Sequence, residues 1–392
     1  MESEDLVLIG GDVVTQEGVI PHGAVTIRDG LIVSVAGGPS PGVRNSTRKI
    51  DCQGKTVMPG FIDVHTHGGI GLDFEDDDPS VIERLSEYYF RHGTTTLLAT
   101  LPALPVEKMI PALERLVTYC RTHETDTNIH GVHVEGPYLN KAMRGGMTEA
   151  YIEEPQLRSW KKIKSVGGKY IKMITLAPEL PGIEPIIRDA VEDKTVVSLG
   201  HSAADGEATM KAIKAGATQA THLFNAMPGL RHRDPGILAE ILLADTVDAQ
   251  IIADGIHVHP KIIELAVRLK SSDHIIAITD SMRAAELSDG EFASAGHMVR
   301  VEGGVSKLKD GTLAGSTLVF EKACRLLVQE VGIALPEAAR MTSLNAARSL
   351  GISVQTGSIE AGKAADLVVL DSGFTVLLTL HHGIIRHDGL TH

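Results

Sequence analysis

Alternation of short apolar runs with helix-like segments is the feature that most constrains the fold of this chain. Eight runs with strand character follow one another between residues 57 and 279, and segments with helical periodicity separate them. Repeated strand–helix units of this kind build parallel sheets. The eight runs are Val57–Val64, Thr94–Thr100, Ile129–Val134, Lys172–Leu176, Thr195–Leu199, Gln219–Leu223, Ala249–Ala253 and Ile275–Thr279.

The number of these units selects one architecture among the parallel folds. Eight units within roughly 300 residues match the size of a (β/α)8 barrel. A doubly wound sheet usually has fewer strands and carries a glycine-rich phosphate loop, and the sequence has neither a GxGxxG nor a Walker A motif. We therefore predict an α/β fold with a TIM-like (β/α)8 barrel. The clearest helical segments are Ser80–Arg91, Val106–Cys120, Gly206–Ala215, Pro260–Leu269, Ser316–Val331 and Pro336–Leu350.

Both ends of the chain carry short strand patterns instead of strand–helix units. Neither set has enough apolar surface to form a stable sheet alone. We predict that residues 1–56 and 356–392 together form a small split β-sandwich domain, and that residues 57–355 form the barrel. The expected strands are Leu6–Ile9, Ala24–Ile27, Leu31–Val35, Lys49–Cys52, Asp366–Leu370, Thr375–Leu380 and Gly383–Ile385.

Charge and cysteine content exclude several classes of partner. The chain has 37 Lys and Arg against 50 Asp and Glu, and this net charge of −13 disfavours nucleic acid or an anionic membrane. Cys52, Cys120 and Cys324 lack metal or redox spacing, which suits a reducing compartment. Residues 1–5 are acidic, unlike a signal peptide, and no apolar run approaches the roughly 18 residues of a membrane span. We predict a cytoplasmic protein that binds neither nucleic acid nor membrane.

Histidines and carboxylates close several of the predicted strands. The first run ends in Val64-His65-Thr66-His67, and the two-residue period of a strand puts both imidazoles on one face, where they can share a metal ion. Glu135 ends the third run. Each residue by itself also fits an ordinary buried or helix-capping role.

Taken together, these strand ends predict a metal site. Barrel enzymes place their reactive groups at the carboxyl ends of the strands. A ring of nitrogen and oxygen ligands there suits Zn²⁺ or Fe²⁺ with positions open for water. Such an ion lowers the pKa of bound water to about 7, and a neighbouring carboxylate can accept the proton. The pattern predicts a hydrolase with one or two divalent ions per chain, built on His65, His67, Glu135, His201, His222 and Asp280.

Two long motifs resemble the amidohydrolase superfamily, whose members embed a metal-bearing barrel in a split β-sandwich. They are PGFIDVHTHG at residues 59–68 and GKAADLVVLD at residues 362–371. Further segments resemble the N-acetylglucosamine-6-phosphate deacetylase family more narrowly, and the resemblance runs nearly end to end. These segments are HVEGP at residues 133–137, GHS at 200–202, THLFNAM at 221–227, ADGIH at 253–257 and LAGS at 313–316.

The resemblance implies a role for each matching residue. Glu135, His201 and His222 match the ligands of the main metal ion, and His65 and His67 are available for a second ion bridged by Glu135. Asp280 matches the catalytic aspartate. The positions that match contacts to the sugar phosphate, and to the sugar itself, are Asn225, Ala226, Arg233, His257, Leu313, Ala314 and Gly315.

The reaction implied is removal of acetate from a 6-phosphorylated N-acetyl amino sugar, with Asp280 shuttling the proton. One position departs from the family. A histidine that polarises the acetyl carbonyl usually stands about a dozen residues after the metal-binding glutamate, and this chain has Met147 there. Methionine cannot donate a hydrogen bond.

Two alternatives stay open. An amidohydrolase acting on another N-acyl or cyclic amide would explain Met147, whereas Arg233 and His257 speak against it. A non-catalytic barrel scaffold is disfavoured by the complete ligand set and by Asp280. The resemblance also suggests a homodimer. It leaves the native metal, the number of ions and the gluco or galacto configuration of the sugar open.

Overall fold

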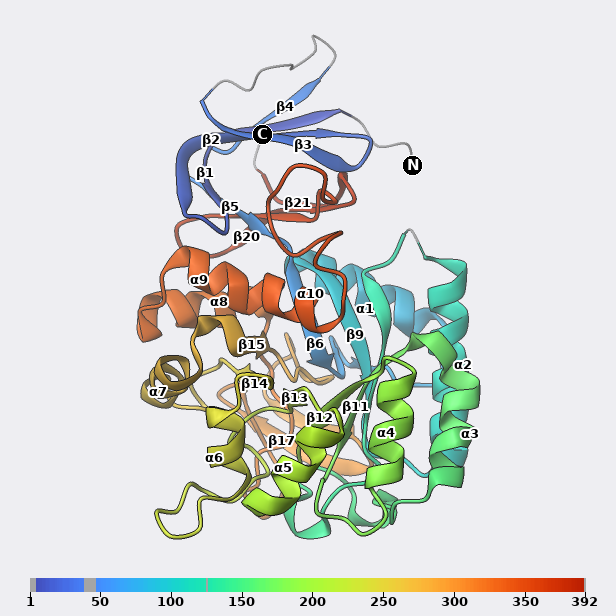
Figure 1. Cartoon of the computed structure of the whole chain (residues 1–392). Coiled ribbons are helices and arrows are strands. Elements are labelled where there is room, and N and C mark those ends of the chain that lie inside the picture. Colours follow the sequence, from blue (N-terminus) through green and yellow to red (C-terminus); the bar gives the residue numbers. More distant parts are fainter. Residues whose placement is uncertain (1–4, 39–46, 125, 391–392) are drawn as a thin grey trace. The chain divides into compact units, whose positions relative to one another are not determined.

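A computed structural model of the chain describes residues 5–38, 47–124 and 126–390 (Figure 1). Residues 1–4, which carry most of the acidic start of the chain, lie outside the described residues. The chain divides into two compact units. The sheet unit comprises residues 1–63, 87–96 and 320–392, and the barrel unit comprises residues 64–86 and 97–319. The predicted domain boundaries at residues 56/57 and 355/356 stay a prediction.

An eight-stranded sheet forms the barrel, in the order β6–β9–β10–β11–β12–β13–β14–β15. The pairings from β9 to β15 are parallel. The backbone N–H of Asp280 donates to the carbonyl of His65 at 2.9 Å, which brings the two ends of the sheet together. The predicted TIM-like barrel is therefore confirmed. Its strands are β6 (Phe61–Thr66), β9 (Thr94–Leu101), β10 (Ile129–Glu135), β11 (Ile171–Leu176), β12 (Val196–Leu199), β13 (Gln219–Ala220), β14 (Asp248–Ile252) and β15 (Ile275–Ile278).

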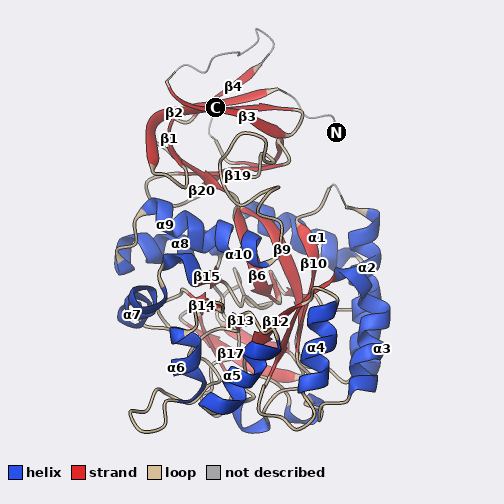
Figure 2. Ribbon diagram, viewed as in Figure 1, coloured by secondary structure: helices blue, strands red, loops and turns tan. Residues whose placement is uncertain are grey.

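Helices lie along these parallel strands (Figures 1 and 2). Strands covered in this way are buried on both faces, and all eight residues of β9 are buried. The capping of α5 is typical of helix ends: the side chain of Asp205 accepts from the N–H of Ala208 at 2.8 Å, and Gly216 closes the helix with φ 112°. The helices are α1 (Ser80–Arg91), α2 (Val106–Thr122), α3 (Leu157–Gly167), α4 (Glu184–Glu192), α5 (Gly206–Ala215), α6 (Gly236–Leu243) and α7 (Pro260–Lys270), with 3₁₀ turns at Lys141–Met143, Glu149–Tyr151, Gly168–Tyr170 and Ser272–His274.

Two small sheets occupy loops of the barrel unit and have no counterpart among the predicted strands. Strands β7 (Gly68–Gly69) and β8 (Leu72–Asp73) form a short hairpin after β6. After β15 follows a three-stranded antiparallel sheet, which packs over a small apolar core. Its strands are β16 (Gly290–Ser294), β17 (His297–Glu302) and β18 (Val305–Lys307), and its core contains Met282, Ala284, Val299, Val301 and Ala314.

The sheet unit contains a mainly antiparallel sheet built from both ends of the chain, as predicted. Its core combines Leu8 and Val25 from the start with Val369 and Leu378 from the end. The strand order is β21–β20–β19–β5–β1–β2–β3, and β4 pairs with β1. These strands are β1 (Leu6–Val14), β2 (Val19–Arg28), β3 (Leu31–Gly37), β4 (Arg48–Asp51), β5 (Thr56–Pro59), β19 (Leu367–Leu370), β20 (Val376–His381) and β21 (Ile384–Asp388).

Several expected elements have other bounds than the sequence pattern suggested, and three of them differ for a visible reason. The run Val57–Val64 is divided between β5 and β6. The run Gln219–Leu223 keeps only two strand residues, because the chain turns at Thr221. The expected helix Ser316–Val331 starts at Phe320, because Ser316 is held in an extended segment by its N–H to the carbonyl of Asp280. The helical region after β18 consists of α8 (Phe320–Leu326), α9 (Leu335–Ala339) and α10 (Asn345–Ser349), with π-helical turns at Leu327–Val331 and Arg340–Leu344.

Within the described ranges, none of the helices has the length and apolar character needed to cross a membrane. Cys52, Cys120 and Cys324 are buried and free.

Candidate active site

Six side chains from five different strand ends converge inside the barrel unit. Glu135 lies at the centre of the group: its Oε1 is 3.1 Å from His201 Nε2, 3.3 Å from His222 Nε2 and 3.4 Å from His65 Nε2. Its other oxygen, Oε2, is 3.2 Å from His67 Nε2. The carboxylate thus touches all four imidazoles, which supports its predicted role as a shared ligand.

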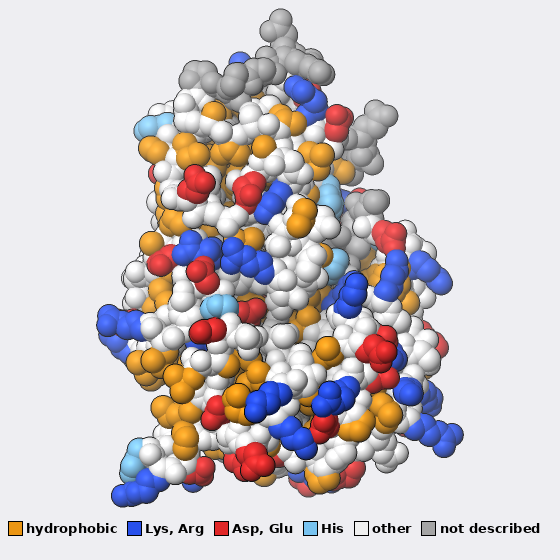
Figure 3. Space-filling model, in the orientation of Figure 1, with side chains coloured by type: hydrophobic (Ala, Val, Ile, Leu, Met, Phe, Trp, Pro, Cys, Tyr) orange, Lys and Arg blue, Asp and Glu red, His pale blue; other side chains and the backbone are white. Residues whose placement is uncertain are grey.

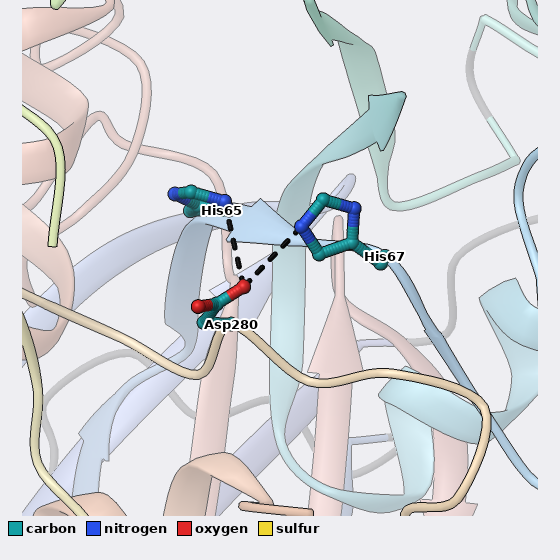
Figure 4. Close-up of side chains that lie close together, drawn as sticks. All are labelled: His65, His67 and Asp280. Atoms are coloured by element: carbon teal, nitrogen blue, oxygen red, sulfur yellow. Dashed lines mark ion pairs between the residues drawn. The ribbon is translucent and has the colours of Figure 1, made fainter. Parts of the chain in front are cut away.

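Asp280 closes the group from the end of β15. Its Oδ1 is 3.2 Å from His67 Nε2 and 3.5 Å from His65 Nε2, and Figure 4 shows both imidazoles turned toward this carboxylate. The structure therefore brings together all the predicted metal ligands and the predicted catalytic aspartate.

Hydrogen bonds on the far side of two rings set their orientation. His201 Nδ1 donates to the carbonyl oxygen of Met143 at 2.9 Å, and His65 Nδ1 donates to Gln250 Oε1 at 3.1 Å. Each bond places a proton on Nδ1 and turns Nε2 toward Glu135. Metal-binding histidines are oriented in the same way.

The geometry of the group fits a divalent cation better than a network of hydrogen bonds. His201 Nε2 and His222 Nε2 lie 3.0 Å apart, and both nitrogens also face Glu135 Oε1. Among the described residues, Glu135 Oε2 is a buried atom without a hydrogen-bond partner. The candidate ligand atoms of Glu135, His201 and His222 all lie within 4.8 Å of one another, as do those of His65, His67 and Asp280. Burying such groups is costly unless a cation compensates them.

Electrostatics keep both carboxylates ionised at neutral pH. Burial alone would raise their pKa values, but the surrounding imidazoles outweigh it. The pKa of Glu135 lies well below its ordinary value because of His65, His201 and His222. The pKa of Asp280 falls to about 2 because of His65 and His67. Glu135 is therefore suited to bind a cation, and Asp280 is suited to accept a proton.

Backbone strain accompanies these side chains. His201, His222 and Asp280 adopt φ values of 49°, 29° and 50°, in the left-handed region that residues other than glycine rarely occupy. Ala226, beside the predicted sugar-phosphate contacts, has φ 51°. Strain of this kind costs roughly 1–3 kcal/mol per residue and gathers at functional sites.

A cavity of about 380 Å³ opens above the ligands. Its wall includes every predicted contact to the sugar and its phosphate except Arg233: Asn225, Ala226, His257, Leu313, Ala314 and Gly315. Arg233 is exposed on the loop of residues 229–235 and does not line this cavity.

The imidazole of His257 is paired with a carboxylate in this wall. Its Nδ1 donates to Asp254 Oδ2 at 2.7 Å. Burial would lower the pKa of His257, but the carboxylate of Asp254 raises it above its ordinary value. The other carboxylate oxygen of Asp254 accepts from the backbone N–H groups of Ile256 and His257, which fixes the pair. An imidazole that donates hydrogen bonds in this position suits an anionic group.

Met147 also lines the cavity. It is 7% exposed and packs with Ala103, Leu139 and Ile152 in a small apolar cluster. The wall after β10 is therefore apolar at the position where the family usually presents a histidine.

Two polar residues of the site were not anticipated from the sequence. Gln250 orients His65 from within β14 and is itself held by a bond to Gln219 Oε1 at 2.7 Å. Glu75, from the loop after β8, lines the cavity. Gln250 could have been identified as a glutamine inside an otherwise apolar strand. Glu75 gave no such signal, because it lies in a run of acidic residues that is typical of a solvated loop.

A third cluster with metal-ligand chemistry lies in the sheet unit. Asp366, His381 and His382 place ligand atoms within 4.8 Å of one another. Here the carboxylate is already satisfied: Asp366 Oδ2 accepts from the hydroxyl of Thr356 at 2.6 Å, and Oδ1 accepts from the backbone N–H of His382 at 2.8 Å. This arrangement explains the cluster as a structural hydrogen-bond network.

The fold and the site define a class of protein: a barrel hydrolase whose active site is built from histidine and carboxylate groups at the ends of its strands. The model of the amidohydrolase family matches residues 56–385. The chain belongs to this family, and within it to the N-acetylglucosamine-6-phosphate deacetylases.

Individual relatives cover almost the whole chain. The N-acetylglucosamine-6-phosphate deacetylase of Bacillus subtilis (strain 168) is 36% identical, over 98% of this chain and 97% of its own. The N-acetylgalactosamine-6-phosphate deacetylase of Escherichia coli O157:H7 is 34% identical, over 92% and 94%. Among solved structures, a mutant N-acetyl-D-glucosamine-6-phosphate deacetylase from Mycobacterium smegmatis in complex with N-acetyl-D-glucosamine-6-phosphate superposes with a TM-score of 0.92, at 31% identity and over 98% and 99%.

Proposed function

We propose that this protein hydrolyses the acetamide of a 6-phosphorylated N-acetyl amino sugar, N-acetylglucosamine 6-phosphate, to acetate and the amino-sugar phosphate. The observation that carries the proposal is one cavity that combines the ligand group around Glu135, the Asp280 carboxylate and the His257 imidazole. Relatives at 35–36% identity are named for this reaction, and one at 34% is named for the galactosamine counterpart.

We propose that Glu135, His201 and His222 would hold the main divalent ion, zinc or iron, and that His65 and His67, together with Glu135, would hold a second ion. The contacts of both Glu135 oxygens support this assignment. A divalent ion bound there supplies a Lewis acid that activates water and polarises the amide carbonyl.

The remaining steps belong to side chains of this chain. Asp280, ionised at neutral pH, accepts the proton of the attacking water and then delivers it to the nitrogen of the leaving amine. Asn225, the backbone of Ala226 and His257 hold the phosphate from the cavity wall, and Leu313, Ala314 and Gly315 cover the sugar. Arg233 is proposed as a further phosphate contact from the resemblance alone, since it is exposed outside this cavity. This binding places the acetamide carbon beside Asp280.

Removing a phosphate contact is expected to weaken binding of the phosphorylated substrate selectively. A charge-assisted hydrogen bond contributes about 1.5–3 kcal/mol, so His257→Ala and Arg233→Ala are each expected to raise KM for the 6-phosphorylated sugar roughly ten- to hundredfold. KM for the unphosphorylated sugar is expected to change little. Arg231→Ala, on the same exposed loop as Arg233, is the matched control. Equal losses on both sugars would show that the altered residue does not bind phosphate.

Met147→His is expected to raise kcat for deacetylation. A hydrogen-bond donor of this type is worth about 10² to 10³ in rate when nothing replaces it, and a partial gain is expected because a divalent ion held by Glu135 and the histidines would supply part of the same polarisation. Met147→Leu keeps the apolar volume without a donor and is expected to give no gain. An absence of gain, with one ion per chain and poor activity on every phosphorylated acetamido sugar, would contradict both the two-ion site and the assigned substrate.

We also propose a homodimer in the cytoplasm. Exposed apolar side chains gather over α6 and α7, where Leu243, Ile262, Leu265 and Leu269 are 39–74% exposed (Figure 3). Apolar surface of this kind is often covered by association. The free cysteines fit a reducing compartment. The mass of the protein in solution tests the dimer.

Acetate release from a panel of sugars tests the substrate assignment. The gluco and galacto forms, each with and without the 6-phosphate, separate the epimer from the phosphate requirement. We expect rapid release from N-acetylglucosamine 6-phosphate and slow release from both unphosphorylated sugars. Comparable rates with and without phosphate would favour a different N-acyl substrate.

A further inference from the structure

Glu75 is a cavity-lining carboxyl group that the proposed mechanism does not use. It follows β8, on the loop that leads to α1. Its backbone carbonyl accepts from Arg115 at 3.0 Å, which fixes the loop. Among the described residues, its Oε2 is a buried atom without a hydrogen-bond partner. Such a group destabilises the protein unless a ligand satisfies it.

The charged neighbours of Glu75 are already engaged with one another. Arg283 donates from Nε to Asp73 Oδ2 and from a terminal nitrogen to Asp76 Oδ1, both at 2.7 Å. The hydroxyl of Ser294 also donates to Asp73, at 3.2 Å. Burial and the nearby Asp73 carboxylate raise the pKa of Glu75 to about 7. Near neutral pH the group can therefore accept a hydrogen bond as a carboxylate or donate one as an acid.

The strand order gives the position of Glu75 relative to a bound substrate. In a barrel of eight strands, each strand lies opposite the fourth strand from it, so the neighbouring strands β6, β9 and β10 face β12, β13 and β14. The proposed phosphate contacts, Asn225 and His257, follow β13 and β14. With the sugar phosphate on that side and the amide at the metal ligands, the acyl group points to the opposite wall. We call this wall the acyl wall and define it by Glu75, Pro102 and Met147, which follow β6, β9 and β10 and line the cavity.

We propose that the acyl wall recognises an N-acyl group that carries a hydroxyl on its second carbon, with Glu75 as the partner of that hydroxyl. The inference rests on the proposed function, since it takes the phosphate side and the amide position from it. An acetyl methyl leaves Glu75 Oε2 unsatisfied, whereas the hydroxyacetyl group adds the smallest donor that could reach it. An aminoacetyl group would bring an ammonium charge next to the divalent ion, which repels it.

Three 6-phosphorylated glucosamines that differ only in the acyl group test this proposal: N-acetyl, N-hydroxyacetyl and N-propanoyl. The propanoyl group has nearly the size of hydroxyacetyl without the hydroxyl. We expect the wild-type protein to favour hydroxyacetyl over propanoyl at least tenfold in kcat/KM. Glu75→Leu is expected to bring this ratio within threefold of one, and Glu75→Gln, whose amide oxygen still accepts, is expected to keep part of it. Glu107→Gln, an exposed glutamate on α2, is the charge-matched control and should keep the wild-type ratio.

The outcomes separate this inference from the proposed function. Turnover of the acetyl compound without a preference for hydroxyacetyl, or a preference that Glu75→Leu leaves unchanged, would overturn the role of Glu75 and leave the deacetylase intact. An absence of turnover with all three compounds in the metal-loaded wild-type protein would overturn the proposed function, and this inference with it. The ratio is measured within each variant, so a general loss of activity in a variant does not decide the result.

Discussion

Asp280→Asn is expected to lower kcat by roughly 10² to 10⁴ with little change in KM, because general acid–base help of this kind is worth that much in rate. Asparagine is nearly isosteric with aspartate, but it cannot take up and return a proton. The ionised carboxylate of Asp280, with its pKa near 2, is the acceptor that the reaction loses. Steady-state kinetics on the phosphorylated sugar measure the effect.

Asp245→Asn, an exposed aspartate at the end of α6, makes the same chemical change away from the site and should keep wild-type kinetics. The metal content of Asp280→Asn is expected to stay near that of the wild type, because Glu135, His201 and His222 remain. Activity within threefold of the wild type would remove Asp280 from the mechanism.

His201→Ala and His222→Ala are each expected to deplete bound metal and activity together, by at least about a hundredfold. Each supplies one of only a few ligand atoms, and losing even an outer partner of a metal ligand typically costs ten- to a hundredfold. Elemental analysis of the purified variants, alongside turnover, measures both quantities. Treatment of the wild-type protein with a chelator should reproduce the loss.

His232→Ala alters an exposed histidine on the loop next to the site and serves as the matched control. Full activity in a metal-free His201→Ala variant would exclude metal-dependent chemistry. The His65 and His67 pair decides the number of ions. If His65→Ala keeps one ion per chain and measurable activity, a single ion suffices; if metal and activity fall together, the second position is required.

The fold was predictable where the local pattern and the tertiary environment agree. A strand buried on both faces is typically apolar along its whole length, so β15 stands out in the sequence. Helix α1 runs over the predicted residues 80–91. The prediction of one strand over Val57–Val64 was wrong, because the sequence is similarly apolar on both sides of Gly60. Strand β5 ends before Gly60 and strand β6 of the barrel sheet begins after it. A side chain at Gly60 would lie 2.2 Å from Thr95 Oγ1, and this tertiary contact leaves no local trace in the sequence.

The site was predictable to the extent that the barrel itself determines it. Once His65, Glu135 and Asp280 are assigned to strand ends, the barrel architecture brings them together. In the structure, His65 Nε2 lies 3.4 Å from Glu135 Oε1 and 3.5 Å from Asp280 Oδ1. The shortening of β13 was not predictable, because the left-handed backbone at His222 interrupts the strand. The hydrogen bond of Gln250 to His65 and the missing partner of Glu75 Oε2 both depend on contacts between residues far apart in the sequence. No local sequence pattern predicts such contacts.

The most direct test of the central claim is the amount of acetate that the metal-loaded protein releases from N-acetylglucosamine 6-phosphate. The account predicts acetate and amino-sugar phosphate in equal amounts, loss of both products after chelation, and their return when the divalent ion is restored. A fully metal-loaded protein that releases no acetate from any 6-phosphorylated N-acetyl amino sugar would contradict it.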